Sequence, residues 1–206
     1  MQYSEPIRIL VAEHDVIMSV IEAVEVVAQR SENDFPVEFY EQAFDFFPVF
    51  ADKCHHAKEE THLFPALEAK GFSRESGPVH CMLHEHDEGR AHVAAVRQAL
   101  QQIRNGDPAA RAAVQQHALA YARLLRDHIA KENQVLFVMA DHVLSEAEKK
   151  ELLQRFDCAE HSVLPAGSHE KYVALAGKLR EYAGLSSTSE AGCCHAASKA
   201  HACQHA

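Results

Sequence analysis

Apolar residues recur every three or four positions along most of the chain, and this spacing predicts helices rather than strands. The first such stretch carries a histidine on its apolar face, which runs through Ile7, Leu10, His14, Ile17, Ile21 and Val24. Prolines and glycines divide the pattern, because proline suits the first turn of a helix and glycine the residue after its end. The chain is therefore predicted to be all-α.

Four long helices are expected in the first two thirds of the chain. The first crosses residues 7–24, and the others should cover about 36–70, 78–105 and 108–140. Pro48 lies inside the second helix and should kink it or divide it. Long helices joined by short turns favour an antiparallel four-helix bundle, in which neighbours pack at about +20°.

Shorter elements should follow this bundle. Ser145 with Glu148 forms a capping box for a short fifth helix, and Ser168 is placed to begin a sixth. From residue 186 the composition changes to small and polar residues with interspersed cysteine and histidine. We therefore predict one domain over residues 1–185 and a disordered tail over 186–206.

Charge excludes two classes of partner. The formal net charge is −10, and without a basic patch neither nucleic acid nor an anionic membrane is an expected partner.

The start of the chain lacks the pattern of a signal peptide, so a cytoplasmic location is expected. No stretch approaches the roughly 20 apolar residues of a membrane span. The 16 histidines, unusual in a chain without basic character, indicate metal or pH chemistry.

An internal repeat is the strongest signal of function. The triplet Glu-His-Asp occurs at 13–15 and at 85–87, and the pattern H-x-A-K-E-x-x-x-L-F occurs at 55–64 and at 128–137. The two motifs are separated by almost the same distance in each half. Two copies of one helical hairpin would be related by a pseudo-twofold axis, which would bring two identical sets of side chains face to face.

The repeat selects six candidate metal ligands. Each half supplies one histidine from its first helix and a histidine and a glutamate from its second, namely His14, His55, Glu59, His86, His128 and Glu132. In each second helix the histidine and glutamate are four residues apart and share a face, about 6 Å from one another. A glutamate between two such histidines can bridge two cations.

The chemistry of these donors narrows the metal. Imidazole and carboxylate suit iron, manganese or zinc. Two histidines and two shared glutamates would fill about four of roughly six octahedral positions on each ion. The remaining positions are open to a solvent-derived bridge and to an external ligand such as dioxygen or nitric oxide.

The motifs resemble the haemerythrin-like (HHE cation-binding) family. The resemblance rests on EHD at 13–15, CHHAKEETHLFP at 54–65, GPVHCMLHEHDEGR at 77–90 and DHIAKENQVLF at 127–137. It implies a four-helix bundle with two iron ions (Fe²⁺/Fe³⁺) joined by an oxo or hydroxo bridge. Such a centre binds dioxygen or nitric oxide, or senses or supplies iron. The same six ligands are implied.

The chain departs from the oxygen-carrying members of that family. Those use a further histidine on the third helix, and Met82 stands at that position here. The four-histidine, two-glutamate set is more similar to that of bacterial repair-of-iron-centres proteins and of an iron-sensing domain in a eukaryotic ubiquitin-ligase subunit. We expect Met82 and His62 to lie beside the ligands, because His62 follows His55 by seven residues on the same helix face.

A second register is also available in the second helix. His56 and Glu60 are four residues apart as well, but in an α-helix they would face about 100° away from His55 and Glu59. The fourth helix has Ile129 at the position of His56, so His56 is expected outside the ligand set.

Three hypotheses of function follow. The leading one is a di-iron protein that binds dioxygen or nitric oxide, or senses or buffers iron. The alternative is an enzyme that uses the same centre to reduce peroxide or nitric oxide, or that donates iron for the repair of damaged iron centres. The third is a structural bundle whose histidines merely fill a polar core.

Overall fold

The computed structural model describes residues 3–30, 34–163 and 167–186, and within these ranges the chain forms helices joined by short turns, with no strand. The predicted all-α bundle is confirmed. Its elements are α1 (Glu5–Ala28), α2 (Val37–Phe46), η1 (Phe47–His56), η2 (Glu59–Leu63), α3 (Phe64–Glu68), α4 (Gly77–Arg104), α5 (Ala110–Lys131), η3 (Glu132–Leu136), α6 (Phe137–Val143), α7 (Glu146–Val163) and α8 (Ser168–Ala183). The tail predicted from residue 186 lies outside the described residues, apart from Ser186 itself.

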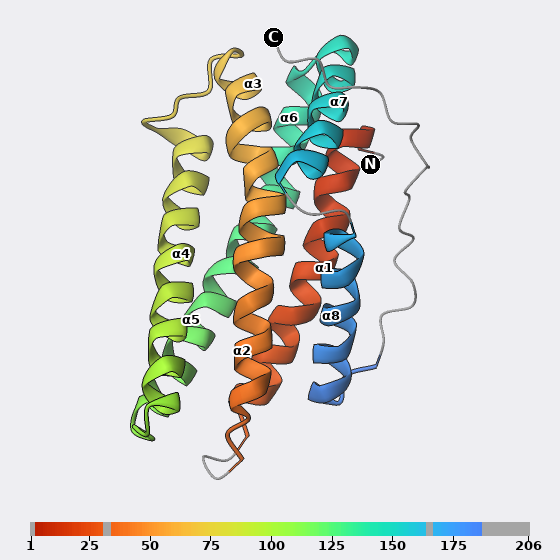
Figure 1. The fold of residues 1–206 in the computed structure, drawn as a ribbon. Helices are drawn as coiled ribbons and strands as arrows, with labels where there is room; N and C mark the ends of the chain where they lie inside the picture. Colours follow the sequence, from red (N-terminus) through yellow and green to blue (C-terminus); the bar gives the residue numbers. More distant parts are fainter. Residues whose placement is uncertain (1–2, 31–33, 164–166, 187–206) are drawn as a thin grey trace.

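Four rods form the body of the molecule (Figure 1). They are α1, the rod from α2 to α3, α4, and the rod from α5 to α6. In Figure 1 the second rod rises from α2 to α3, α4 descends beside it, and the α5–α6 rod rises again. The division into a 1–185 domain and a tail stays a prediction.

The second rod is one helical path whose hydrogen-bonding pattern changes along its length. The α-helix α2 passes into the π-helix η1 at Phe47 and Pro48. Proline has no N–H to donate and its ring crowds the preceding turn, and here the helix widens instead of ending. Two further π-helical turns begin at the candidate ligands Glu59 and Glu132. Such turns inside helices are rare and frequently lie at functional sites.

The core consists of two apolar clusters with a polar layer between them. Along α1, Ile7 and Leu10 belong to one cluster and Ile17 to the other, with buried Glu13 and His14 between them. The same order is found along the other three rods. The polar layer is therefore held from both sides by close-packed apolar side chains, which restrict its movement.

The C-terminal helices complete this packing. The predicted capping box is present, since the Ser145 N–H donates to Glu148 Oε2 at 2.8 Å at the start of α7. Phe156 of α7 is buried in one apolar cluster, and Leu179 of α8 in the other. These helices thus cover the bundle. None of the helices in the described residues is long and apolar enough to cross a membrane.

Candidate metal centre

The polar layer gathers all six side chains that the repeat singles out. They come from α1, η1, η2, α4, α5 and η3, and each is at most 1% exposed: His14, His55, Glu59, His86, His128 and Glu132. Because charged and polar groups are rarely buried without partners, their common burial at one level of the bundle requires an explanation.

The donor atoms fall into two groups that share one glutamate. One group is formed by His14, His55, Glu59 and Glu132, and the other by His56, Glu59, His86 and His128. Within each group the donor atoms lie within 4.8 Å of one another. Each group is compact enough to surround one cation.

Each glutamate lies between histidines from both halves of the repeat. Glu59 Oε2 is 3.6 Å from the Nε2 atoms of both His55 and His86. Glu132 Oε2 is 3.2 Å from His128 Nε2 and 3.1 Å from His14 Nε2. Glu59 therefore belongs to both donor groups, and Glu132, a member of the first group, also lies close to a histidine of the second.

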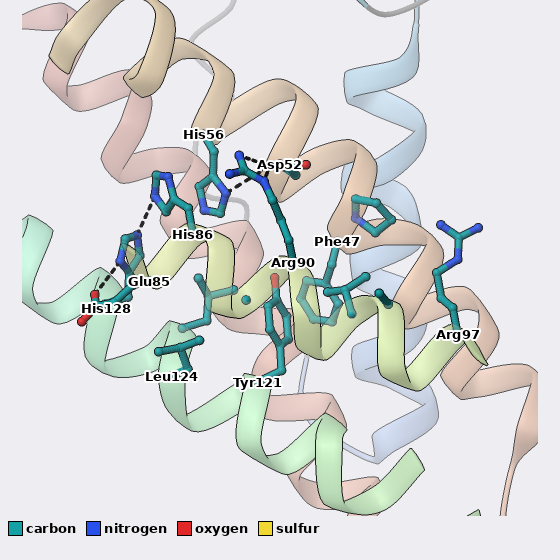
Figure 2. A pocket seen from close by; sticks show the side chains of 15 residues that line it. Phe47, Asp52, His56, Glu85, His86, Arg90, Arg97, Tyr121, Leu124 and His128 are labelled. Carbon is teal, nitrogen blue, oxygen red and sulfur yellow. Dashed lines mark hydrogen bonds and ion pairs between the residues drawn. The ribbon is translucent and has the colours of Figure 1, made fainter. Parts of the chain in front are cut away.

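His56 is the residue that analysis of the sequence placed wrongly. It is 5% exposed and belongs to the second donor group, and its ring stacks on that of His86 with centroids 3.8 Å apart (Figure 2). The expected 100° separation from His55 holds for an α-helix, but both residues end the π-helix η1, where each residue turns less about the axis. Pro48 and the two consecutive histidines were the only signals of this in the sequence.

Buried carboxylates hold the outer nitrogens of two of these histidines. His55 Nδ1 donates to Glu13 Oε2 at 2.9 Å, and Lys58 also donates to Glu13. In the other half, His128 Nδ1 donates to Glu85 Oε2 at 2.9 Å, and Lys131 donates to Glu85. A carboxylate on Nδ1 fixes the tautomer that leaves Nε2 free to bind a metal.

The sequence repeat includes these carboxylates and lysines, but its pattern alone did not indicate their role. Glu13 and Glu85 are the glutamates of the two Glu-His-Asp triplets, and Lys58 and Lys131 are the lysines of the two H-x-A-K-E patterns. Burial alone would raise the pKa of Glu13, but Lys58 and His55 lower it to about 2. Both triplets therefore supply an ionised carboxylate.

The two remaining histidines have unequal partners. His14 Nδ1 lies 2.9 Å from the amide oxygen of Asn133, whereas His86 Nδ1 donates to the Glu60 carboxylate at 2.7 Å. Glu60 also accepts from Arg90 at 2.7 Å. Anionic partners make an imidazole a stronger donor to a metal. The second donor group thus has three imidazoles, and each has a carboxylate near its Nδ1: Glu60 for His86, Glu85 for His128, and Asp52 at 3.5 Å for His56.

Burial keeps three of the imidazoles neutral. Burial and neighbouring imidazoles lower the pKa of His55, His56 and His86 to about 3, against weaker opposing effects of nearby carboxylates. Neutral imidazole is the form that binds metal ions. These side chains are therefore ready to bind a cation at neutral pH.

The two glutamates and His128 share the remaining charge. Burial and the neighbouring Glu132 carboxylate raise the pKa of Glu59 well above its usual range. Burial alone would also raise the pKa of Glu132, but His128 and His14 lower it. Burial would lower the pKa of His128, yet Glu132 and Glu85 raise it to about 9. A proton on His128 thus balances a buried carboxylate, and a cation could replace it.

Several buried donor atoms of the layer make no well-formed hydrogen bond among the described residues: His14 Nε2, His55 Nε2, both ring nitrogens of His56, and both carboxylate oxygens of Glu59 and of Glu132. Some of them lie close to an oppositely charged group, as His14 Nε2 does at 3.1 Å from Glu132 Oε2 and His56 Nδ1 at 3.5 Å from Asp52 Oδ1. A buried polar atom left without a hydrogen bond costs about 1–3 kcal/mol, and a bound cation would offset this cost. The inward-facing imidazole nitrogens and carboxylate oxygens fit iron, manganese or zinc.

Two residues predicted to lie beside the ligands have different surroundings. Met82 is buried in the apolar cluster next to the layer. His62 is partly exposed and its ring lies 6.2 Å from that of Phe156 on α7. In the described part of the chain, His62 belongs to neither donor group. A direct ligand role for His62 is therefore not supported by this geometry.

Comparisons with known proteins agree with this site. The Hemerythrin HHE cation binding domain matches residues 4–140. Uncharacterized proteins of Mycobacterium tuberculosis (strain H37Rv) and Mycobacterium bovis are each 24% identical over 161 residues, which is 78% of this chain and 62% of theirs. The chain thus matches less than two thirds of the length of these relatives. No solved structure matches it. Since the match covers two thirds of the chain and every candidate ligand, the chain belongs to the haemerythrin HHE cation-binding family.

Proposed function

We propose that the protein holds two iron ions, joined by an oxo or hydroxo bridge, and uses them to bind dioxygen or nitric oxide or to sense or buffer iron. The observation that carries the proposal is the position of Glu59 and Glu132, each between histidines of both halves. Held between histidines of both groups, Glu59 and Glu132 would join the two donor groups into a single site for two cations.

The number of donors favours a reactive site over a structural one. His14 and His55 with the two glutamates would fill about four of roughly six octahedral positions, so the first position keeps room for an external ligand. Structural zinc sites are instead closed and four-coordinate, and are commonly built from thiolates. When bound, iron would supply a reversible change of oxidation state and an affinity for diatomic ligands.

Apolar side chains cover part of the layer. Phe137 stacks on His14 with centroids 5.3 Å apart, and Phe64 lies at 5.9 Å from His86. Both phenylalanines come from the repeated Leu-Phe pair, and both are fully buried. These apolar side chains would slow the loss of a bound ligand to water. They would also strengthen electrostatic interactions inside the site.

Metal analysis tests this proposal. Protein purified in air from cells supplied with iron and zinc should contain about two irons per chain. Glu59→Gln and Glu132→Gln should each lower the iron content, whereas His84→Gln, at an exposed position on α4, should leave it unchanged. A wild-type protein that contains stoichiometric zinc and no iron would contradict the proposal.

The reduced, iron-loaded protein then separates carriage from catalysis. Nitric oxide or dioxygen should give a stable adduct at a fixed ratio to the centre, seen by its absorption spectrum. Repeated consumption of nitric oxide or peroxide in the presence of a reductant would instead identify an enzyme. Failure to bind either gas would leave iron storage or sensing as the function.

A further inference from the structure

A cavity of about 250 Å³ lies between η1, α4 and α5 and ends at the imidazole layer. His56, His86 and His128 lie at one end of it and Arg97 at the other (Figure 2), and Ala94, one turn before Arg97 on α4, also lines it. The three histidines are buried, whereas Ala94 and Arg97 are exposed. The cavity therefore reaches from the protein surface to the second donor group.

The wall of this cavity is mainly apolar. It includes Phe47, Pro48, Val93, Tyr121, Leu124 and Leu125. The charged groups in the interior of the wall already have partners: Arg90 donates to Asp52 and to Glu60, each at 2.7 Å, while Arg97 at the outer end lies 3.6 Å from Asp45. Glu85 likewise accepts from His128 and Lys131. A charged guest would have to break these pairs, whereas a neutral apolar guest would not.

Gly89 contributes to the room in the cavity. It lies in the interior of α4, where glycine is a poor helix former compared with alanine. A Cβ atom at this position would meet Tyr121 Cε2 at 3.2 Å and Leu124 Cδ2 at 3.9 Å. Even a methyl group would therefore press on the side chains of α5 that form the opposite wall.

We propose that this cavity is the entry path and holding site for a small neutral molecule, of the class of dioxygen and nitric oxide, on its way to the two-cation centre, which it reaches beside His56, His86 and His128. Apolar cavities of about 150 Å³ in proteins hold xenon or benzene, so this volume is sufficient for a diatomic molecule. Delivery of the molecule to a metal centre rests on the proposed function, whereas the capacity of the cavity to hold an apolar molecule does not.

Two substitutions narrow the path at different depths, and each has a matched control. Ala94→Phe places a ring at the exposed outer end, and Ala91→Phe places the same ring at an exposed position of α4 outside the cavity. Gly89→Ala narrows the interior, and Gly177→Ala makes the same change in α8, where a Cβ meets nothing within 4 Å. All four should retain the metal content of the wild type.

The first measurement uses xenon, which needs no metal. Crystals of the iron-loaded wild type under xenon pressure should show anomalous scattering from xenon inside the cavity, with lower occupancy in Gly89→Ala and unchanged occupancy in Gly177→Ala. A cavity without xenon in the wild type would overturn the proposal.

The second measurement is the rate of nitric oxide association with the reduced protein by stopped flow. Ala94→Phe should slow association by about tenfold, because the path must first open, and Gly89→Ala should slow it less. Both control variants should match the wild type. Equal rates in Ala94→Phe and Ala91→Phe would show that the ligand enters elsewhere. If the wild type forms no adduct at all, the gas-binding part of the proposed function fails, while xenon still decides whether the cavity holds apolar guests.

Discussion

The repeat places one lysine in each half beside an equivalent glutamate, and the two lysines differ in burial. Lys58 is 1% exposed and contacts Glu13, which is 4% exposed. Lys131 is 42% exposed and contacts Glu85, which is 12% exposed. The substitutions Lys58→Met and Lys131→Met therefore make the same chemical change in two environments, within one molecule.

The structure predicts a large difference between these variants. Removing Lys58 leaves the Glu13 carboxylate buried without its cation, although His55 and the Cys54 thiol still donate to it. Loss of one member of a buried ion pair costs about 3–5 kcal/mol. Removing Lys131 breaks a pair that reaches solvent, where such interactions contribute about 0–1 kcal/mol. Since domains are stable by only about 5–15 kcal/mol, the first loss would be a large fraction of the total.

Urea unfolding of the metal-free protein measures the two losses. Metal must be removed because a ligand that binds only the folded state adds its own stabilisation. Unchanged slopes against urea would show that the free energies can be compared directly. The double variant Glu13→Gln with Lys58→Met removes both charges and should recover much of the loss. Equal losses for Lys58→Met and Lys131→Met would refute the argument from burial.

Two further predictions concern the metal centre. The substitution His56→Ile introduces the residue that the other half has at the equivalent position, Ile129. We expect it to weaken the binding of one of the two cations at least about tenfold, measured by competition with a chelator. Binding of both cations as in the wild type would contradict a ligand role for His56. Metal loading at pH 7.5 should release at least about one proton per chain, because a pKa of about 9 keeps His128 protonated until the cation displaces its proton. Calorimetry in two buffers of different ionisation enthalpy measures this release, which should fall as the pH rises above 9, and a release of zero at pH 7.5 would count against displacement.

Local features of the sequence were sufficient for the helices and for the family. Apolar spacing, proline and glycine positions and the Ser145–Glu148 capping box depend on residues a few positions apart, so they can be recognised without tertiary structure. The repeat goes further, because two identical motifs imply two equivalent helical hairpins. It therefore selected His14, His55, Glu59, His86, His128 and Glu132, which the fold gathers in one buried layer. Their role as ligands stays a prediction.

Features that depend on distant contacts could not be obtained in this way. His56 faces the site because the helix becomes π-helical after Pro48, and an α-helical projection places it elsewhere. His86 has the Glu60 carboxylate as its partner, whereas the residue equivalent to Glu60 in the other half is Asn133, which contacts His14. The repeat is symmetric in sequence, but the site that it builds is not.

The sequence by itself determined the helices, their repeat and the chemical type of the donors, because these follow from spacing and residue type along one chain. Only the tertiary structure decided which nitrogens and oxygens converge, which lysine is buried and where a cavity reaches the site. Those properties arise where side chains from three or four helices meet, and packing between helices, not the preference of any single segment, sets their positions.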